Sequence, residues 1–210
     1  MRIIGLTGGI ASGKTAVSDI LASLGAAIID TDMLAREVVQ PGQPGLAEVV
    51  ASFGPEVLQA DGQLNRGALA QRVFADEEAR QRLNGILHPR IRALTAERLT
   101  AARAAGHHAA AVLVVPLLFE NGLETTVEES WVVDVPEALQ RDRLAHRDGL
   151  TAGEVDARLA SQMSRAERLA RADRVILNTG DRAQLREEVL STWRAAGLPR
   201  PTPCEEGAAH

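Results

Sequence analysis

Residues 8–15 read GGIASGKT and place four residues at the spacing G-x-x-x-x-G-K-T: Gly8, Gly13, Lys14 and Thr15. An apolar run at 2–6 precedes them and a helical pattern begins at Thr15, which is the strand and helix context that this spacing requires. Glycines allow close backbone approach, and successive N–H groups at a helix start point at phosphate oxygens. Lys14 reaches the β- and γ-phosphates of a nucleotide, and the Thr15 hydroxyl binds Mg²⁺. The stretch therefore predicts a nucleoside triphosphate site.

Several classes of nucleotide-dependent protein lack their signatures here. A GTPase switch carries D-x-x-G, but none of the 18 glycines follows an aspartate by three positions. The guanine-reading pattern N-K-x-D is broken at 178–181, NTGD, where Thr179 replaces the lysine. The L-S-G-G-Q-like signature of transporter ATPases is absent. A motor ATPase usually has a strand that ends in a carboxylate, but here Pro116 interrupts the long apolar run at 109–119. Asp134, after WVV, could supply that carboxylate or cap the helix that follows.

A small-molecule kinase needs a carboxylate near the acceptor hydroxyl, cations around the γ-phosphate and a lid that excludes water. Asp30 and Asp32 follow an apolar run at 26–30, at the sheet edge where ligands of α/β proteins bind. We interpret Asp30 as the cap of the next helix, and Asp32 as the group that acts on the acceptor proton or on Mg²⁺. Arg143 and Arg147 share a helix face. They could stabilise charge on the transferred phosphoryl group, or they could be ordinary exposed arginines.

The elements that must position these residues follow from apolar periodicity. Strands are predicted at 2–6, 26–30, 131–135 and 174–178. A further strand is predicted in the apolar run 109–119, where Pro116 must end it. Predicted helices alternate with them at 15–25, 31–40, 136–147, 151–172 and 182–197. This alternation predicts an α/β fold with a parallel sheet covered on both faces. Residues 44–105 are predicted to be mostly helical, with breaks at Gly54, 60–65 and 88–90. The polar stretch at 147–165 suits a mobile lid or a solvated helical hairpin equally.

Composition limits the partners and the compartment. The net charge is −5 with no basic block, so nucleic acid is not an expected partner. No apolar stretch approaches a membrane span, and the first apolar run is too short for a signal peptide. The one cysteine, Cys204, cannot form an internal disulfide, so a cytoplasmic location is expected. Lys14 is the one lysine among 23 basic side chains, which favours a site that needs a compact ammonium group.

Seven motifs occur in an order and spacing that closely resemble the dephospho-coenzyme A kinase family. They are IIGLTGGIASGKT, IIDTD, HP (88–89), VPLLFE (115–120), RDGLT (147–151), ARLASQMS (157–164) and NTGD (178–181). The resemblance covers about residues 3 to 197. Ala11 stands where many members have glycine, at a position that the phosphate-binding spacing leaves free.

The resemblance implies transfer of the γ-phosphoryl group of ATP, with Mg²⁺, to the ribose 3′-hydroxyl of dephospho-CoA. It also implies a P-loop NTPase fold with a five-stranded parallel sheet in a single domain over 1–198, with a tail at 199–210 that is expected to be disordered. Within that domain, the implied parts are a core at about 1–32, 107–146 and 172–198, a helical acceptor-binding region at about 33–106 and a lid at about 147–165. A monomer is expected.

The implied site residues fall into three groups. The catalytic group is Lys14, Asp32 and Arg147. The residues expected to bind ATP are Gly8, Ala11, Ser12, Gly13, Lys14, Thr15, Ala16 and Asn178, the last near the adenine, with Thr15 also on the metal. The residues expected to contact dephospho-CoA are Asp32, Arg66, His88 and Leu117. His107 and His108 match no motif and are interpreted as loop residues.

Two alternatives stay open beside this interpretation. A nucleoside or nucleotide kinase of related architecture would share the phosphate-binding stretch and would differ in its acceptor. An ATP-gated switch that binds a protein partner would bind nucleotide without acceptor-dependent hydrolysis and would expose a large apolar patch.

Overall fold

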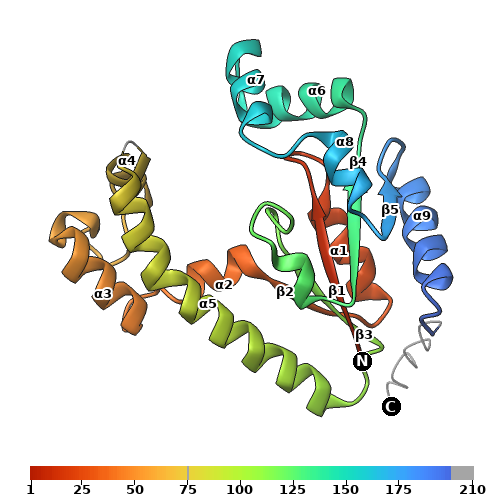
Figure 1. Cartoon of the computed structure of the whole chain (residues 1–210), viewed down its shortest axis with the longest axis horizontal. Helices are drawn as coiled ribbons and strands as arrows, with labels where there is room; N and C mark the ends of the chain where they lie inside the picture. Colours follow the sequence, from red (N-terminus) through yellow and green to blue (C-terminus); the bar gives the residue numbers. More distant parts are fainter. Residues whose placement is uncertain (75, 200–210) are drawn as a thin grey trace, which may run out of the picture. The chain divides into compact units, whose positions relative to one another are not determined.

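The computed structural model describes residues 1–74 and 76–199 (Figure 1). The chain divides into two compact units, one formed by Met1–Ile28 with the chain from Ala102 onward, and the other by Ile29–Ala101. Cys204 and all but the first residue of the predicted tail lie outside the described residues.

The centre of the first unit is a five-stranded sheet in the order β2-β3-β1-β4-β5. The strands are β1 (Arg2–Gly8), β2 (Ala27–Asp30), β3 (Ala110–Val114), β4 (Glu129–Asp134) and β5 (Arg174–Leu177). β1 pairs in parallel with β3 and with β4, and β4 pairs in parallel with β5. The order and pairing confirm the predicted five-stranded parallel sheet, and β3 ends before Pro116, as predicted.

Side chains on one face of the strands pack against α1 (Lys14–Ser23) and α9 (Arg182–Ala195). Alternate residues of each strand reach this core, because successive side chains of a strand point to opposite faces. Trp131 on β4 and Trp193 on α9 are its largest fully buried side chains. This packing fixes the carboxyl end of β1 relative to the start of α1, and those two points bracket the glycine-rich stretch.

Three further helices complete the described part of the first unit, together with the short 3₁₀ helix η2 (Leu123–Thr126). They are α6 (Glu137–Asp148), α7 (Ala152–Ala160) and α8 (Arg165–Ala170). Residues 151–172 are helical, as predicted, but they form two helices, since the chain leaves the helix between α7 and α8. Ser164 begins α8 through a capping box, in which its hydroxyl accepts from the Glu167 N–H and the Glu167 carboxylate accepts from Ser164.

The second unit is helical, as predicted, and has its own apolar core. Its helices are α2 (Thr31–Glu37), α3 (Pro44–Phe53), the short η1 (Pro55–Val57), α4 (Arg66–Phe74) and α5 (Glu77–Ala105), which runs on into the first unit. Val49 and Val57 are fully buried in this core. The predicted breaks at Gly54 and at 60–65 are both present.

The predicted break at 88–90 is wrong, because α5 continues through Pro89. A proline inside a helix removes one N–H, and its ring crowds the carbonyl four residues earlier. Here that residue is Gly85, which is exposed, so water can hydrogen-bond to its carbonyl. The rest of this long helix outweighs the one lost hydrogen bond.

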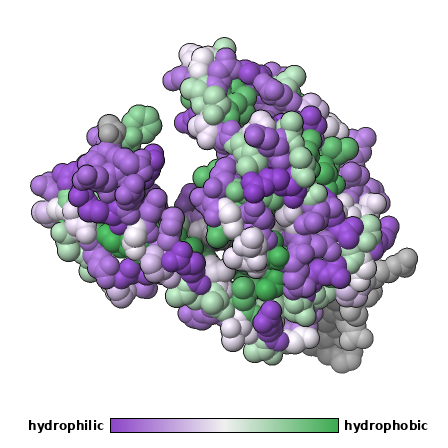
Figure 2. Space-filling model, viewed as in Figure 1, coloured by the Kyte–Doolittle hydropathy of each residue, from purple (hydrophilic) through white to green (hydrophobic). Residues whose placement is uncertain are grey.

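The surface shown in Figure 2 is dominated by hydrophilic residues, with apolar residues in separate patches. Within the described residues, no helix combines the length and the apolar character needed to span a bilayer.

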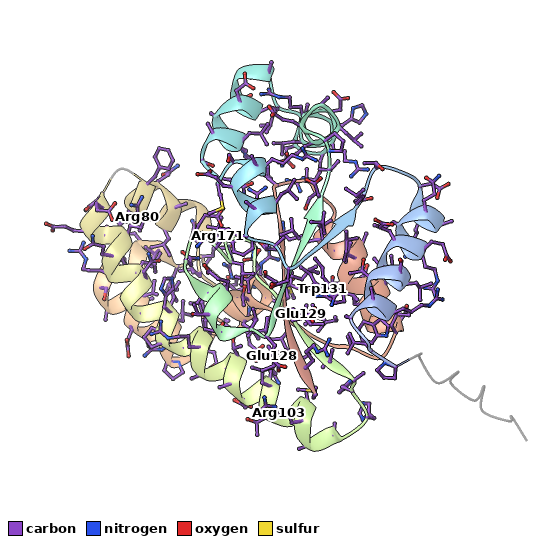
Figure 3. All side chains as sticks on the ribbon, turned by 45° about the vertical axis from the view of Figure 1, so that its right-hand side comes forward. Arg80, Arg103, Glu128, Glu129, Trp131 and Arg171 are labelled. Carbon is purple, nitrogen blue, oxygen red and sulfur yellow. The ribbon has the colours of Figure 1, made fainter. Side chains whose placement is uncertain are left out.

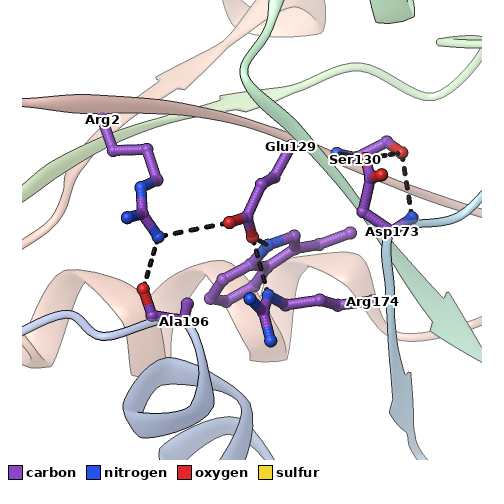
Figure 4. Close-up of polar contacts among 7 residues, drawn as sticks. Arg2, Glu129, Ser130, Asp173, Arg174 and Ala196 are labelled. Carbon is purple, nitrogen blue, oxygen red and sulfur yellow. Dashed lines mark hydrogen bonds and ion pairs between the residues drawn. The ribbon is translucent and has the colours of Figure 1, made fainter.

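A polar cluster joins the amino-terminal ends of β1, β4 and β5 (Figures 3 and 4). The Glu129 carboxylate accepts from Arg174 Nε at 2.7 Å, from the Trp131 indole at 2.9 Å and from Arg2 at 3.2 Å. Arg2 also donates to the Ala196 carbonyl, just beyond α9. The Arg174 hydrogen bond is the largest cause that holds the pKa of Glu129 below its ordinary value. The cluster therefore ties three strands to α9 through one ionised carboxylate.

The neighbouring Ser130 and Asp173 add a second link between β4 and the start of β5. Asp173 Oδ2 accepts from the Ser130 N–H and from its hydroxyl, both at 2.7 Å. These hydrogen bonds lower the pKa of Asp173.

Replacing Glu129 by glutamine is expected to lower the free energy of unfolding at neutral pH by about 1–3 kcal/mol, because the amide presents a donor to groups that are themselves donors. The folded-state pKa of Glu129 is lowered, so its contribution is complete above the ordinary value of 4.5 and is lost as pH falls through the folded pKa. Urea unfolding at neutral and at strongly acidic pH should show the difference between the two proteins shrinking in acid.

Glu128→Gln is the matched control for this prediction. Glu128 is exposed and accepts from the Ile3 N–H at 3.0 Å, a role that a glutamine oxygen can keep. An equal loss of stability in both variants would contradict the special role of Glu129.

Candidate functional site

The glycine-rich stretch forms a tight loop between the end of β1 and the first residue of α1. Gly13 has φ 93° just before α1, and Ala11, with φ 57°, is the one non-glycine residue with positive φ among the described residues. The Ser12 N–H donates to the Gly9 carbonyl at 3.1 Å and closes the turn. The first N–H groups of α1 have no partner within the helix, and its positive end lies at the loop.

Neighbouring groups pack so closely on this loop that side chains would not fit at its glycines. A Cβ on Gly8 would lie 2.5 Å from the Val133 carbonyl oxygen. A Cβ on Gly13 would lie 2.2 Å from the Asn178 amide nitrogen, at a φ that disfavours any side chain. The required glycines of the motif are thus explained by close approach as well as by backbone freedom.

Lys14 begins α1 and turns its ammonium group back onto the loop. Its Nζ donates to the Gly8 carbonyl at 2.8 Å and to the Gly9 carbonyl at 3.3 Å. Thr15, the next residue, is exposed in the first turn of α1. Both side chains therefore lie at the loop, as the motif predicted.

Side-chain amides from three other segments bind the backbone of the loop. Gln140 on α6 donates to the Ile10 carbonyl at 2.7 Å, and Gln162, between α7 and α8, accepts from the Ile10 N–H at 2.8 Å. Asn178, just after β5, is buried and donates to the Ser12 carbonyl at 2.7 Å. Asn178 thus binds the phosphate loop itself, and its predicted place near the adenine stays a prediction.

A cavity of about 520 Å³ lies among α6, α7, α8 and the segment before α8. Its lining includes Arg141, Arg165 and Arg168 as well as Gln140 and Gln162. Glu137 and Asp156 also line the cavity, so the loop at Ile10 is held by side chains that line a cavity with charges of both signs.

Asp134 at the end of β4 is buried and binds Arg165 through both oxygens, at 2.8 and 2.6 Å. This pairing raises the pKa of Arg165. Pro136 is the residue that precedes α6, and no side chain caps that helix. The interpretation of Asp134 as a helix cap is therefore wrong, whereas its use as a metal ligand stays open.

Arg168 on α8 is a cation that sequence reasoning missed. Only 7% of it is exposed, and it donates to the Met163 carbonyl at 2.6 Å. Its Nη1 would lie 3.1 Å from a Cβ on Gly9, so the guanidinium is beside the phosphate loop. Burial lowers the pKa of Arg168, while the charges of Glu120 and Asp134 oppose that shift.

The residues around the loop fit a nucleoside triphosphate. The Ser12 hydroxyl is buried without a hydrogen-bond partner, and backbone N–H groups, Lys14 and Arg168 supply donors and positive charge. The described residues contain no group of three or more acidic, histidine or cysteine side chains suited to a metal. Mg²⁺ in phosphate sites uses few protein ligands and several phosphate oxygens, so Thr15 alone fits this pattern.

A sequence model of a protein family covers most of the chain. The model described as dephospho-CoA kinase matches residues 2–184. The chain belongs to the dephospho-CoA kinase family. A curated dephospho-CoA kinase of Moorella thermoacetica is 51% identical over 194 residues, which is 92% of each chain.

Two solved structures extend the family match to the fold. A crystal structure of a Thermus thermophilus protein has a TM-score of 0.83 and 34% identity, and the match covers 94% of this chain and 98% of that one. Dephospho-CoA kinase from Campylobacter jejuni has a TM-score of 0.69 and 28% identity, over 92% and 96% of the two chains. The predicted P-loop kinase fold is confirmed.

The residues that family resemblance assigns to the acceptor lie mostly in the second unit. Asp30 caps α2, because its carboxylate accepts from the N–H groups of Asp32 at 2.8 Å and Met33 at 3.3 Å. This confirms the cap predicted for Asp30. Asp32 itself is exposed in the first turn of α2.

Three other predicted acceptor residues are accessible. Arg66 is the exposed first residue of α4, and His88 is exposed within α5. Leu117, in the first unit just after β3, is 38% exposed. Their contacts with dephospho-CoA stay predictions.

Arg147, assigned to the lid, is exposed in the last turn of α6. It binds the adjacent Asp148 at 2.8 and 3.0 Å, and that hydrogen bond raises the pKa of Arg147. Asp148 also accepts from Arg158 on α7 at 3.0 Å. In this structure the guanidinium is therefore engaged at the end of the α6–α7 hairpin, the region of the predicted lid.

Proposed function

We propose that this chain transfers the γ-phosphoryl group of ATP to the ribose 3′-hydroxyl of dephospho-CoA, giving ADP and coenzyme A. The supporting observation is the joint presence of a fully formed phosphate loop and 51% identity to a dephospho-CoA kinase over 92% of both chains. The fold alone would support any P-loop kinase. The family match is what favours this acceptor.

In the proposed reaction, the phosphates of ATP bind the backbone N–H groups of residues 11–16, and Lys14 binds the β- and γ-phosphates. Thr15 would hold Mg²⁺, which neutralises charge on the β- and γ-phosphates. The Ser12 hydroxyl, buried and without a partner, gains an acceptor when the phosphate binds. Arg66, His88 and Leu117 contact dephospho-CoA in this proposal.

Asp32 accepts the proton of the 3′-hydroxyl as that oxygen bonds to the γ-phosphorus. The bond from this phosphorus to the oxygen that bridges it to the β-phosphorus breaks, and ADP leaves. Lys14, Arg168 and Arg147 stabilise the charge on the transferred group. For this role Arg147 must exchange its contact with Asp148 for the phosphate, a change that closure of residues 147–165 would allow and that would exclude water.

The proposed function is tested by ADP release with a panel of acceptors. The purified chain with ATP and Mg²⁺ should release ADP when dephospho-CoA is present, and should be nearly inactive with nucleosides or nucleoside monophosphates. Turnover with a nucleoside monophosphate and none with dephospho-CoA would favour the related nucleotide kinase. ATP binding without any acceptor-dependent ADP release would favour the ATP-gated switch.

We also propose that the enzyme acts in the cytoplasm as a monomer. The single cysteine of the sequence is compatible with a reducing compartment. Size-exclusion chromatography with light scattering tests the oligomeric state.

A further inference from the structure

The peptide groups on both sides of Ile10 are held by two glutamine side chains. Gln140 Nε2 donates to the Ile10 carbonyl at 2.7 Å, and Gln162 Oε1 accepts from the Ile10 N–H at 2.8 Å. Gln140 is 7% exposed and packs so closely on Gly9 that a Cβ there would lie 2.4 Å from its amide nitrogen. One residue of the phosphate loop thus receives a donor and an acceptor from outside the loop.

Each of these hydrogen bonds fixes the orientation of one peptide plane. In a trans peptide the carbonyl and the following N–H point in opposite directions. The bond from Gln140 to the Ile10 carbonyl therefore turns the Ala11 N–H away from Gln140. The bond from the Ile10 N–H to Gln162 turns the Gly9 carbonyl the other way, where it accepts from the Ser12 N–H at 3.1 Å and from Lys14 at 3.3 Å.

The conformation that follows is one that the backbone does not favour unaided. Ala11 has φ 57°, in the left-handed region that costs about 1 kcal/mol or more for a residue with a side chain. External hydrogen bonds on the preceding residue help to keep the loop in this state. Without them, rotation of the Ile10–Ala11 peptide would present a carbonyl where an N–H is needed for phosphate.

The two glutamines flank the helical hairpin formed by α6 and α7. Gln140 lies on α6, and Gln162 follows α7. Arg141 on α6 pairs with Asp156 on α7, and Arg158 on α7 pairs with Asp148 on α6. Next to Gln162, the Met163 N–H donates to Glu120 at 3.1 Å. A shift of the hairpin therefore acts on both peptides of the loop.

We infer that Gln140 and Gln162 are positioning residues that hold the phosphate loop in its ATP-binding conformation and link that conformation to the α6–α7 hairpin. This inference rests on the proposed binding of ATP at the loop. It assigns the two side chains opposite hydrogen-bonding roles, a donor at 140 and an acceptor at 162. Because the two roles are opposite, the same substitution at both positions distinguishes positioning through a hydrogen bond from simple packing.

The same substitution at the two positions should have opposite results. Gln162→Glu keeps an acceptor for the Ile10 N–H, whereas Gln140→Glu removes the donor and sets a carboxylate against the Ile10 carbonyl. Calorimetric titration with ATP, without acceptor, should give a dissociation constant about tenfold or more higher for Gln140→Glu than for Gln162→Glu. Both variants add one negative charge, and the difference should persist at high salt, which screens charge repulsion.

Methionine variants supply the matched loss of both roles. Gln140→Met and Gln162→Met should each weaken ATP binding, and Gln162→Glu should bind ATP more tightly than Gln162→Met. The KM for dephospho-CoA should change by less than about threefold in all four glutamine variants, because the loop binds ATP, the phosphoryl donor, and not the acceptor. If Gln140→Glu fails to fold, the comparison of the ATP dissociation constants of Gln162→Glu and Gln162→Met still tests the inference.

Equal weakening by Gln140→Glu and Gln162→Glu would overturn the inference, as would Gln162→Met binding ATP as tightly as Gln162→Glu. Dissociation constants within about twofold of wild type in all variants would overturn it too. Failure of the unaltered protein to bind ATP is a different result, because it would contradict the proposed function itself.

Discussion

Replacement of Asp32 by asparagine is expected to lower kcat by about 10²–10⁴-fold, the range for loss of a positioned general base. The amide cannot accept the proton of the 3′-hydroxyl but keeps nearly the same size and can still hydrogen-bond to the acceptor. The dissociation constant for ATP should stay within about twofold of wild type, because the phosphates bind the loop at residues 8–15. Steady-state kinetics and calorimetric titration with ATP measure the two effects separately.

Asp30→Asn is the matched control for Asp32. Asparagine is as good a helix cap as aspartate, so the start of α2 should be preserved while a carboxylate two residues away is removed. Near-normal kcat in Asp32→Asn, or an equal loss in Asp30→Asn, would contradict the role assigned to Asp32.

Replacement of Lys14 by methionine is expected to lower kcat/KM for ATP by about 10²–10³-fold, as when one preorganised donor to a transition state is removed. Methionine keeps the apolar stem and loses the ammonium that binds the Gly8 and Gly9 carbonyls. Both kcat and ATP affinity should fall, because the charge faces phosphate before and during transfer. Initial rates over a range of ATP concentrations give the two parameters.

Lys14→Arg separates charge from shape at the same position. The planar guanidinium is wider than an ammonium group and cannot place a compact donor between two carbonyls of the loop. We expect this variant to recover only a small part of the lost activity. Full activity in Lys14→Arg would show that charge alone suffices, and full activity in Lys14→Met would remove Lys14 from the chemistry.

Much of the fold follows from local patterns in the sequence. Apolar runs predict the strands because at least one face of each is covered, and the runs at 2–6 and 109–119 stop close to Gly8 and Pro116, where β1 and β3 end. The cap at Asp30 was predictable because a short acceptor side chain stands directly before a helical pattern. The phosphate loop was predictable because its spacing encodes backbone geometry that few other sequences can adopt.

The failures have physical causes that a local pattern does not contain. The helix continues through Pro89 because the lost hydrogen bond leaves only the carbonyl of the exposed residue Gly85 to water, and the rest of this long helix outweighs that loss. The division between α7 and α8 was encoded in the capping box of Ser164 and Glu167, a signal that the helical periodicity masked.

The supporting residues of the site were the hardest to predict. Gln140, Gln162 and Arg168 lie in polar helical stretches, and each reads as an exposed side chain. They come together at the loop only through tertiary packing. Asp134 looked like a helix cap because it follows a strand, but its partner Arg165 lies 31 residues away in sequence. Long-range pairing of this kind leaves no mark on local spacing.

Identification of the product formed from dephospho-CoA tests the central claim most directly. Phosphorus NMR of a reaction with ATP and Mg²⁺ should show the loss of the ATP γ-phosphate signal and the growth of one new phosphomonoester signal, at the ribose 3′-position of coenzyme A. ADP should accumulate in equal amount. Free inorganic phosphate without this phosphomonoester, or a phosphomonoester at another position, would contradict the account.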